Sequence, residues 1–211
     1  MARTRGSTKA STHERIVESA ASEIRKHGCS GISVANVMKA AGLTHGGFYA
    51  HFMSRDDMLE QALDRGNAEG IARLIAAGQL AEPGGALDAI VASYLSDRHV
   101  DHPEGGCTLA ALGTELARQA PRLRHRATRH VEAMVRLIAE QLPGDDMPDQ
   151  RARALAMVSS LVGAVVIARL VDDPTLSRMI RDAVTRSIAG DPVRRPRRPR
   201  RRRSARAVAA R

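Results

Sequence analysis

The chain has 211 residues, of which 43% are hydrophobic and only four are aromatic, so a folded core is expected and a wholly disordered polymer is excluded. The basic excess lies at the two ends: residues 191–211 hold ten arginines and one acid, and residues 1–55 hold eight basic and three acidic residues. Residues 56–190 hold fifteen basic and nineteen acidic residues. This distribution predicts a head that binds a polyanion, a slightly acidic body and a basic tail.

The two cysteines, Cys29 and Cys107, are far apart and lack the spacing of a zinc finger or a disulfide framework, which favours a reducing cytoplasm. No apolar signal segment follows the basic N-terminus. The most apolar run, residues 155–168, is too short for a membrane span and is typical of a buried helix. We therefore expect a cytoplasmic protein without a membrane partner.

Helical periodicity runs through nearly the whole sequence, and no segment alternates apolar and polar residues as a half-buried strand does. Residues 1–11 are expected to be a disordered basic arm, and a capping box that starts at Ser11 predicts the first helix. A short second helix is predicted between Ser33 and Gly42, and a third runs from Thr44 to about His51. The fourth begins after Ser54 and runs to about Gly78.

Five further helices are predicted after the break at residues 83–85. Their expected ranges are 86–98, 107–118, 121–142, 151–171 and 175–188. Residues 191–211 are rich in arginine and proline and are expected to be disordered. The predicted fold class is all-α with about nine helices, divided into an N-terminal three-helix domain at 12–55 and a C-terminal helical bundle at 56–190.

Three of the four aromatic residues lie within five positions, at Phe48, Tyr49 and Phe52. The two phenylalanines are four residues apart and share one helical face, so they anchor this short helix to a core while Tyr49 points elsewhere. Gly42 in the preceding turn permits a left-handed backbone, which predicts a helix-turn-helix. The second helix of such a unit enters the major groove of DNA.

Polar groups on this second helix are suited to phosphate. Free amides at a helix N-terminus attract phosphate, the Thr44 hydroxyl adds a contact, and Tyr49 is placed to donate to a phosphate oxygen. Gly46 and Gly47 each cost a helix about 1 kcal/mol relative to alanine, which is understandable if the backbone must approach DNA closely. The alternative is that these glycines only shape a turn.

The stretch from about Thr12 to Leu63 resembles the TetR/AcrR family of bacterial transcription regulators, through Ile32–Thr44, Gly46–Phe52 and Ser54–Asp56. The resemblance implies an all-helical homodimer that binds a palindromic operator in double-stranded DNA and releases it when a small molecule binds the C-terminal domain. It also implies phosphate contacts from Ser33, Thr44, Tyr49, His51 and Arg55, and positions near base edges for His45, Gly46 and Gly47. The chain departs from the family at His45, where Lys, Arg or Pro is frequent, and at Gly47, where a hydroxyl residue is frequent.

The predicted helix over 151–171 is apolar almost all round, so it needs cover on more than one side. Small residues four apart let a second helix approach closely, and we expect this helix and the one over 175–188 to form a dimer interface. The alternative is a helix buried within one chain. The expected interface residues are Ser159, Ser160, Gly163, Ala164 and Ile167.

A pocket for the effector is expected among the helices between residues 86 and 142, although core packing is the alternative for each lining residue. The expected lining residues are Tyr94, Leu95, Cys107, Leu112, Met134, Leu137 and Met157. The scarcity of aromatics argues against a stacking cage for flat cations. The segment Gly105–Leu116 resembles a part of one subset of TetR-like regulators and does not identify a ligand.

The loop between residues 99 and 107 holds two histidines, two acids and Cys107, a set that is chemically able to bind a metal. Ordinary solvated side chains are the expected reading, so no metal or cofactor is predicted. For Cys107, packing is favoured over redox sensing. Motifs of P-loop, zinc-protease, hydrolase and dinucleotide-binding enzymes are missing from the sequence, so no enzyme is predicted.

The leading function is a ligand-released transcriptional repressor. The alternative is an architectural or non-specific nucleic-acid-binding protein that uses the arginine-rich tail. Whether that tail binds DNA or is a tolerated extension stays open, as do the effector, the operator and the choice between repressor and activator.

Overall fold

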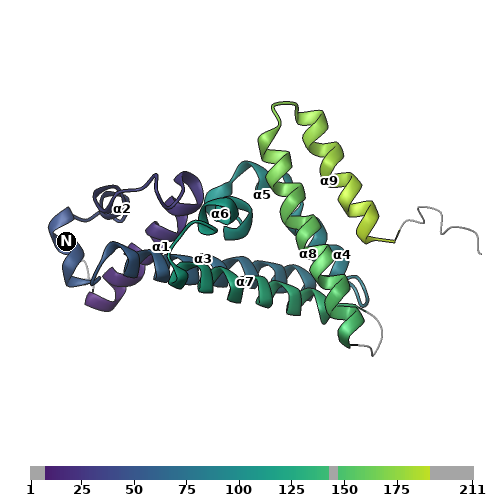
Figure 1. Cartoon of the computed structure of the whole chain (residues 1–211), viewed down its shortest axis with the longest axis horizontal. Helices are drawn as coiled ribbons and strands as arrows, with labels where there is room; N and C mark the ends of the chain where they lie inside the picture. The colour runs from purple at the N-terminus through teal and green to yellow at the C-terminus, as the bar shows by residue number, and fades with distance from the viewer. Residues whose placement is uncertain (1–7, 143–146, 191–211) are drawn as a thin grey trace, which may run out of the picture.

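The structure is a computed structural model that describes residues 8–142 and 147–190. Within those ranges every regular element is a helix, which confirms the predicted all-α class (Figure 1). The first half holds α1 (Lys9–His27), α2 (Val34–Ala40), the 3₁₀ helix η1 (His45–Ala50), α3 (Arg55–Gln79), α4 (Ala86–Tyr94), α5 (Asp97–Asp101) and the 3₁₀ turn η2 (Pro103–Gly105). The second half holds α6 (Thr108–Leu116), α7 (Pro121–Ala139), α8 (Met147–Leu170) and α9 (Pro174–Ile188). Residues 1–7 of the predicted arm and the predicted tail lie outside the described residues.

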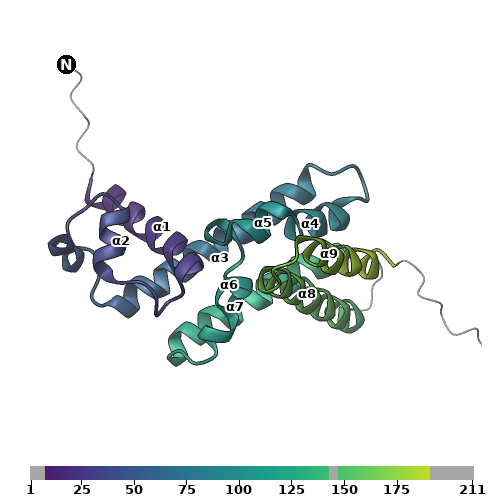
Figure 2. The same cartoon turned by 90° about the horizontal axis from the view of Figure 1, so that it is seen from above.

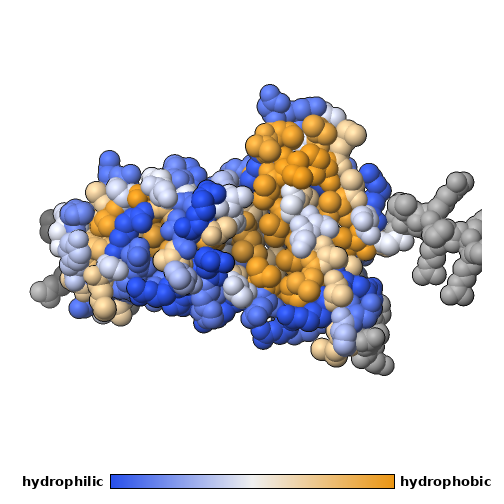
Figure 3. Space-filling view, in the orientation of Figure 1, coloured by the Kyte–Doolittle hydropathy of each residue, from blue (hydrophilic) through white to orange (hydrophobic). Residues whose placement is uncertain are grey.

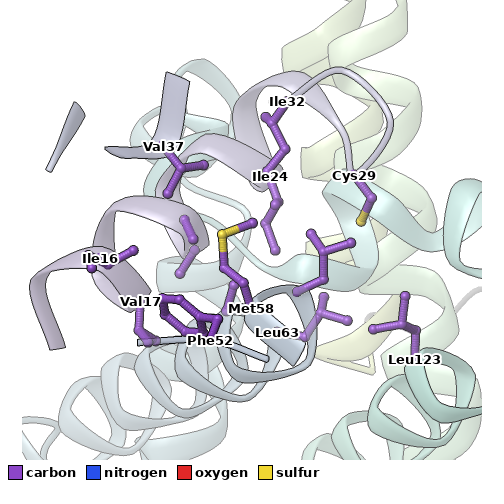
Figure 4. Packing of buried hydrophobic residues seen from close by; sticks show 14 of the residues in the cluster. Ile16, Val17, Ile24, Cys29, Ile32, Val37, Phe52, Met58, Leu63 and Leu123 are labelled. Atoms are coloured by element: carbon purple, nitrogen blue, oxygen red, sulfur yellow. The ribbon is translucent and has the colours of Figure 1, made fainter. Parts of the chain in front are cut away.

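Two apolar cores hold these helices together. The first lies around α1, α2, η1 and the beginning of α3, where side chains from widely separated positions converge (Figure 4). It also takes in Leu112 and Leu116 of α6 and Leu123 of α7. The second core lies among the end of α3, α4, α7 and α8. The long helix α3 therefore belongs to both cores, and it runs beside α7 along the length of the molecule (Figures 1 and 2).

The start of α1 differs from the prediction. Thr8 is the N-cap, because its side chain accepts a hydrogen bond from the Ser11 amide at 3.2 Å. The Ser11 hydroxyl is turned back to the Thr8 carbonyl at 2.9 Å and does not cap the helix. The predicted cap at Ser11 is thus wrong, and residues 9–11 are helical rather than part of an arm.

The single helix predicted over 86–98 is interrupted. Ser96 caps a separate α5 by accepting from the His99 amide at 3.3 Å, and α4 ends at Tyr94. The carbonyl of Leu95, which the break leaves without a helical partner, accepts from Nη1 of Arg181 on α9 at 2.8 Å. Nη2 of the same guanidinium pairs with Asp97 at 2.6 Å, so a residue distant in sequence stabilises the break.

Helix α8 is long and apolar enough to cross a membrane by length and composition alone. A third of its most apolar window is buried within the chain, where it packs between α7 and α9. Its remaining apolar surface forms part of an exposed face, which is described below.

Candidate functional site

Phe48 of η1 and Phe52, which lies just after its C-cap, anchor this short helix as predicted. Phe48 is 1% exposed and Phe52 is 2% exposed, and their rings stack with centroids 5.2 Å apart. The imidazole of His13 on α1 stacks on Phe52 at 4.8 Å. The short helix is therefore fixed from two sides, on the core and on α1.

The turn between α2 and η1 is a helix-turn-helix corner. Gly42 has φ 71°, a left-handed conformation that favours glycine. The Leu43 amide donates to the Met38 carbonyl at 2.8 Å, and Nη2 of Arg15 donates to the Ala41 carbonyl at 2.8 Å. These bonds satisfy the backbone at the end of α2 and fix the direction in which η1 leaves it.

Helix η1 is a 3₁₀ helix rather than a longer regular helix to His51. Its bonds include Gly47 amide to Thr44 carbonyl at 3.2 Å and His51 amide to Phe48 carbonyl at 2.9 Å. Two consecutive glycines weaken α-helical preference here, and the buried rings impose the geometry instead. Thr44 occupies the N-cap position, but its side chain makes no capping bond, so its hydroxyl is available to a partner.

The outer side of η1 is open. Tyr49 is 74% exposed, and Thr44, His45 and Gly46 are exposed as well. A methyl group placed on Gly46 would meet no atom within 4 Å, and on Gly47 it would meet only Cε of Met38 at 3.5 Å. Neither glycine has a positive φ, so neither the fold of one chain nor its backbone conformation requires glycine at these positions.

His51 is half-buried beside His13, with ring centroids 5.9 Å apart. Burial, then the charges of His13 and Lys9, lower the pKa of His51, which favours the neutral ring in the free chain. The ring of His13 is itself held by Gln61 at 2.8 Å.

The other predicted phosphate contacts are Ser33 and Arg55, and both have partners within the chain. The Ser33 hydroxyl caps α2 by accepting from the Asn36 amide at 3.1 Å. Nη2 of Arg55 donates to the carbonyls of Cys29 and Ile32, which ties the start of α3 to the loop after α1. The phosphate contact that the family resemblance implies for Arg55 stays a prediction, while in this structure its guanidinium braces the start of α3.

A carboxylate on α6 ties this helix to the loop that follows α1. Glu115 accepts from the backbone amides of Cys29 at 2.9 Å and Ser30 at 2.7 Å, and from the Ser30 hydroxyl at 2.7 Å. Burial alone would raise the pKa of Glu115, but these hydrogen bonds outweigh it and lower the pKa. At the other end of α6, the Thr108 hydroxyl donates to the Asn67 side chain of α3. Helix α6 is thus held at its start against α3 and at its end against the loop that follows α1.

A cavity of about 490 Å³ lies among α3, α4, α5, η2 and α7, next to the start of α6. Of the predicted lining residues it includes Tyr94, Cys107 and Met134, and it excludes Leu95, Leu112, Leu137 and Met157. Leu112 is buried in the first core, and the other three belong to the second. The cavity walls also hold polar residues that the prediction missed: Arg73, Ser93, Ser96, Arg98, His99, His102, Glu104 and His130.

Two histidines of the cavity are neutral. Nδ1 of His99 lies 2.6 Å from the Tyr94 carbonyl, and Nε2 accepts from the Cys107 amide at 2.9 Å. Burial lowers the pKa of His99 and that of His130, each to about 4. Within the part of the chain that the structure describes, Nδ1 of His130 and the hydroxyl of Tyr94 are buried without a well-formed hydrogen bond. Burial also raises the pKa of Tyr94, so its hydroxyl keeps its proton.

The predicted dimer residues lie on different sides of α8. Ser159, Ser160 and Ile167 are exposed and Gly163 is half-buried, but Ala164 packs inside the chain, so its assignment to the interface is wrong. Large apolar side chains are exposed on α8 and α9, and they make the broad hydrophobic face that Figure 3 shows over these two helices. They are Met147, Leu155, Val166, Ile167, Leu170, Leu176 and Met179.

The loop considered for metal binding is part of the cavity wall instead. Among the described residues, no group of three or more histidine, cysteine or acidic side chains is arranged to hold a metal ion. His102 pairs with Glu104 at 3.2 Å, and His99 is engaged by backbone groups.

Comparisons with known proteins agree with this architecture. Residues 16–62 match the model of the bacterial regulatory proteins of the tetR family, and residues 83–182 match the C-terminal domain of LmrA/YxaF-like transcriptional regulators. An uncharacterised HTH-type transcriptional regulator of Mycobacterium tuberculosis is 30% identical over 172 residues, which cover 77% of this chain and 86% of that one.

Two solved structures share the fold. A TetR-family regulator from Cytophaga hutchinsonii superposes with a TM-score of 0.72 at 22% identity, covering 85% of this chain and 94% of that one. A TetR regulator from Chloroflexus aurantiacus gives the same TM-score and identity over 85% and 95% of the two chains. Both family models describe bacterial transcriptional regulators, a class whose members imply a cytoplasmic location. The chain belongs to the TetR family of bacterial transcriptional regulators and carries its DNA-binding helix-turn-helix.

Proposed function

We propose that this regulator is a repressor that binds a palindromic operator as a homodimer and leaves it when a small molecule fills the cavity. The observation that carries the proposal is the position of α6, which begins at the cavity wall and ends on the DNA-binding head. Cys107, the N-cap residue of α6, lines the cavity, and Glu115 in the last turn holds the amides of Cys29 and Ser30.

The release of DNA follows from this geometry by a rigid-body argument. A ligand that needs α6 displaced would pull Glu115 away from the loop between α1 and α2, and that loop is followed directly by α2 and η1. Binding energy is then used to favour a head orientation unsuited to DNA. Effector binding therefore lowers the affinity for the operator, and operator binding lowers the affinity for the effector, because the two favour different positions of α6.

The homodimer is supported by the exposed apolar face of α8 and α9. Isolated surface leucines are ordinary, but seven exposed large apolar side chains on two adjacent helices, most of them in one broad face, need cover. A two-fold pairing of these helices gives a four-helix interface and places one η1 on each side. The dimer would present two recognition elements to one face of the duplex.

The test is selection of bound sequences from a random DNA pool, followed by in vitro transcription from a promoter that carries the selected site. We expect two inverted half-sites about one helical turn apart, and reduced transcription when the protein is added. Recovery of unrelated sequences would contradict operator binding, and increased transcription would contradict the repressor assignment. The matched control is Tyr49→Ala, which removes an exposed side chain of η1 and leaves both cores intact.

A further inference from the structure

The cavity has an unbalanced positive charge. Arg73 on α3 and Arg98 on α5 both line it from its solvent-exposed side, and neither makes an ion pair with any of the described residues. The nearest acid to this group on α3, Glu69, is already held by Arg25 at 2.9 Å and by Arg65 at 2.7 Å. The cavity's own acid, Glu104, lies 3.2 Å from His102.

The cations of this region also repel one another. Burial, then the charges of Arg25 and Arg98, lower the pKa of Arg73, against the opposing effect of Glu69. Arg169 lies behind the cavity wall, where its guanidinium donates to the carbonyls of His99 and Val100 and adds a further positive charge. His99 and His130 are neutral at pH 7, so they add no charge to the cavity and the excess comes from the arginines alone.

The remaining surface of the cavity suits the body of an organic molecule. Leu74 and Met134 provide apolar contact, while among the described residues Nδ1 of His130 has no hydrogen-bond partner and the buried hydroxyl of Tyr94 faces only the weak partner Cys107. Tyr94 is 3% exposed and His130 is 4% exposed, so such unsatisfied groups carry a cost that a bound molecule or water would remove.

We infer that the effector is a small organic anion, whose acidic group binds Arg73 and Arg98 and whose body lies against Leu74, Met134 and Tyr94. This inference rests on the proposed function, because it names the chemical class of the molecule that the cavity binds. Hydrophobic cations are disfavoured, since they would meet two unpaired guanidinium groups and only one carboxylate.

The test uses two fluorescent probes with the same ring skeleton, 8-anilinonaphthalene-1-sulfonate and the uncharged N-phenyl-1-naphthylamine. We expect the full-length protein to bind the sulfonate at least about tenfold more tightly, because a charge-assisted contact to arginine is made by that probe alone. The double variant Arg73→Gln/Arg98→Gln should lose this preference, and Arg73→Lys with Arg98 intact should keep part of it. The control Arg136→Gln removes an exposed arginine of α7 that is outside the cavity and should leave the preference unchanged.

Equal binding of the two probes, no binding of the sulfonate, or an unchanged preference in the double variant would overturn the inference. The last outcome would place the probe on the apolar face of α8 and α9. Circular dichroism and DNA gel shifts on the same samples check the fold of each variant. If wild-type protein shows no preference for the sulfonate but still binds DNA, the anion site is rejected. The assignment as a DNA-binding regulator is then unaffected. Charge-selective binding without release of DNA supports the anion site and rejects ligand-controlled release.

Discussion

Replacing Gly46 with alanine separates the two explanations for the glycines of η1. In the free protein the added methyl group meets no atom within 4 Å, and the residue has no positive φ, so no strain is introduced. Alanine reduces the conformational freedom of the unfolded chain, and we expect the free energy of unfolding to rise by about 0.5–1 kcal/mol. Thermal or urea unfolding followed by circular dichroism measures this change.

On DNA the same methyl group would have a different effect. If the backbone of η1 lies against the duplex, the methyl group overfills a close contact at a cost of about 1–3 kcal/mol per head. Two heads in a symmetric dimer double this, which corresponds to roughly thirtyfold weaker operator binding or more. Fluorescence anisotropy with a labelled operator measures the affinity.

The control is Gly113→Ala on α6, where a methyl group also meets open space, far along the chain from η1. It should gain stability in the same way and keep its affinity for DNA. Wild-type affinity in Gly46→Ala would refute the close-approach explanation, and the glycines would then only shape the turn.

Three further predictions concern single side chains. Tyr49→Phe removes one exposed hydroxyl and little packing, so affinity for all DNA sequences should fall alike, by about 1 kcal/mol per head. An unchanged affinity in fluorescence anisotropy would show that Tyr49 does not contact phosphate. Glu115→Gln weakens the hydrogen bonds to the amides of Cys29 and Ser30, so hydrogen exchange at these two amides should accelerate roughly tenfold or more. The control is Glu132→Gln, which changes an exposed carboxylate. Exchange at the wild-type rate in Glu115→Gln would exclude the coupling through α6. The depressed pKa of His130 makes the neutral form native, so this residue stabilises the fold above pH 6.5 and loses that contribution as pH falls toward 4, by up to about 3 kcal/mol. Urea unfolding from pH 7.5 to 4.5 should therefore fall less steeply in His130→Gln than in wild type, and parallel curves would count against a neutral buried His130.

The helix-turn-helix was predictable from sequence because its signals are local. The aromatic pair at Phe48 and Phe52, the glycine of the turn and the Ser33 cap act within a few residues, and the structure confirms all three. The start of α1 was misplaced because Thr8 and Ser11 are both good caps, and their competition is decided by geometry that the sequence does not contain.

The cavity was less predictable because tertiary contacts create it. The break between α4 and α5 depends on Arg181 of α9, and it turns His99 inward toward Tyr94 and Cys107. Apolar residues in a helical stripe suggested a pocket, but a stripe of this kind packs in the core, as Leu112 does. The unpaired arginine Arg73 would have indicated the cavity, but the sequence does not show that it is unpaired. That becomes clear only when the fold pairs Glu69 with Arg25 and Arg65.

The most direct test of the account is a hydroxyl-radical footprint of the full-length protein on an operator selected from the random pool. Two η1 elements presented by one symmetric dimer predict two protected patches on one face of the duplex, about one helical turn apart between centres. Wild type and Gly113→Ala should give these patches, and Gly46→Ala should lose them at the same protein concentration. A single patch, or even protection along the whole fragment, would contradict the paired recognition elements on which the account depends.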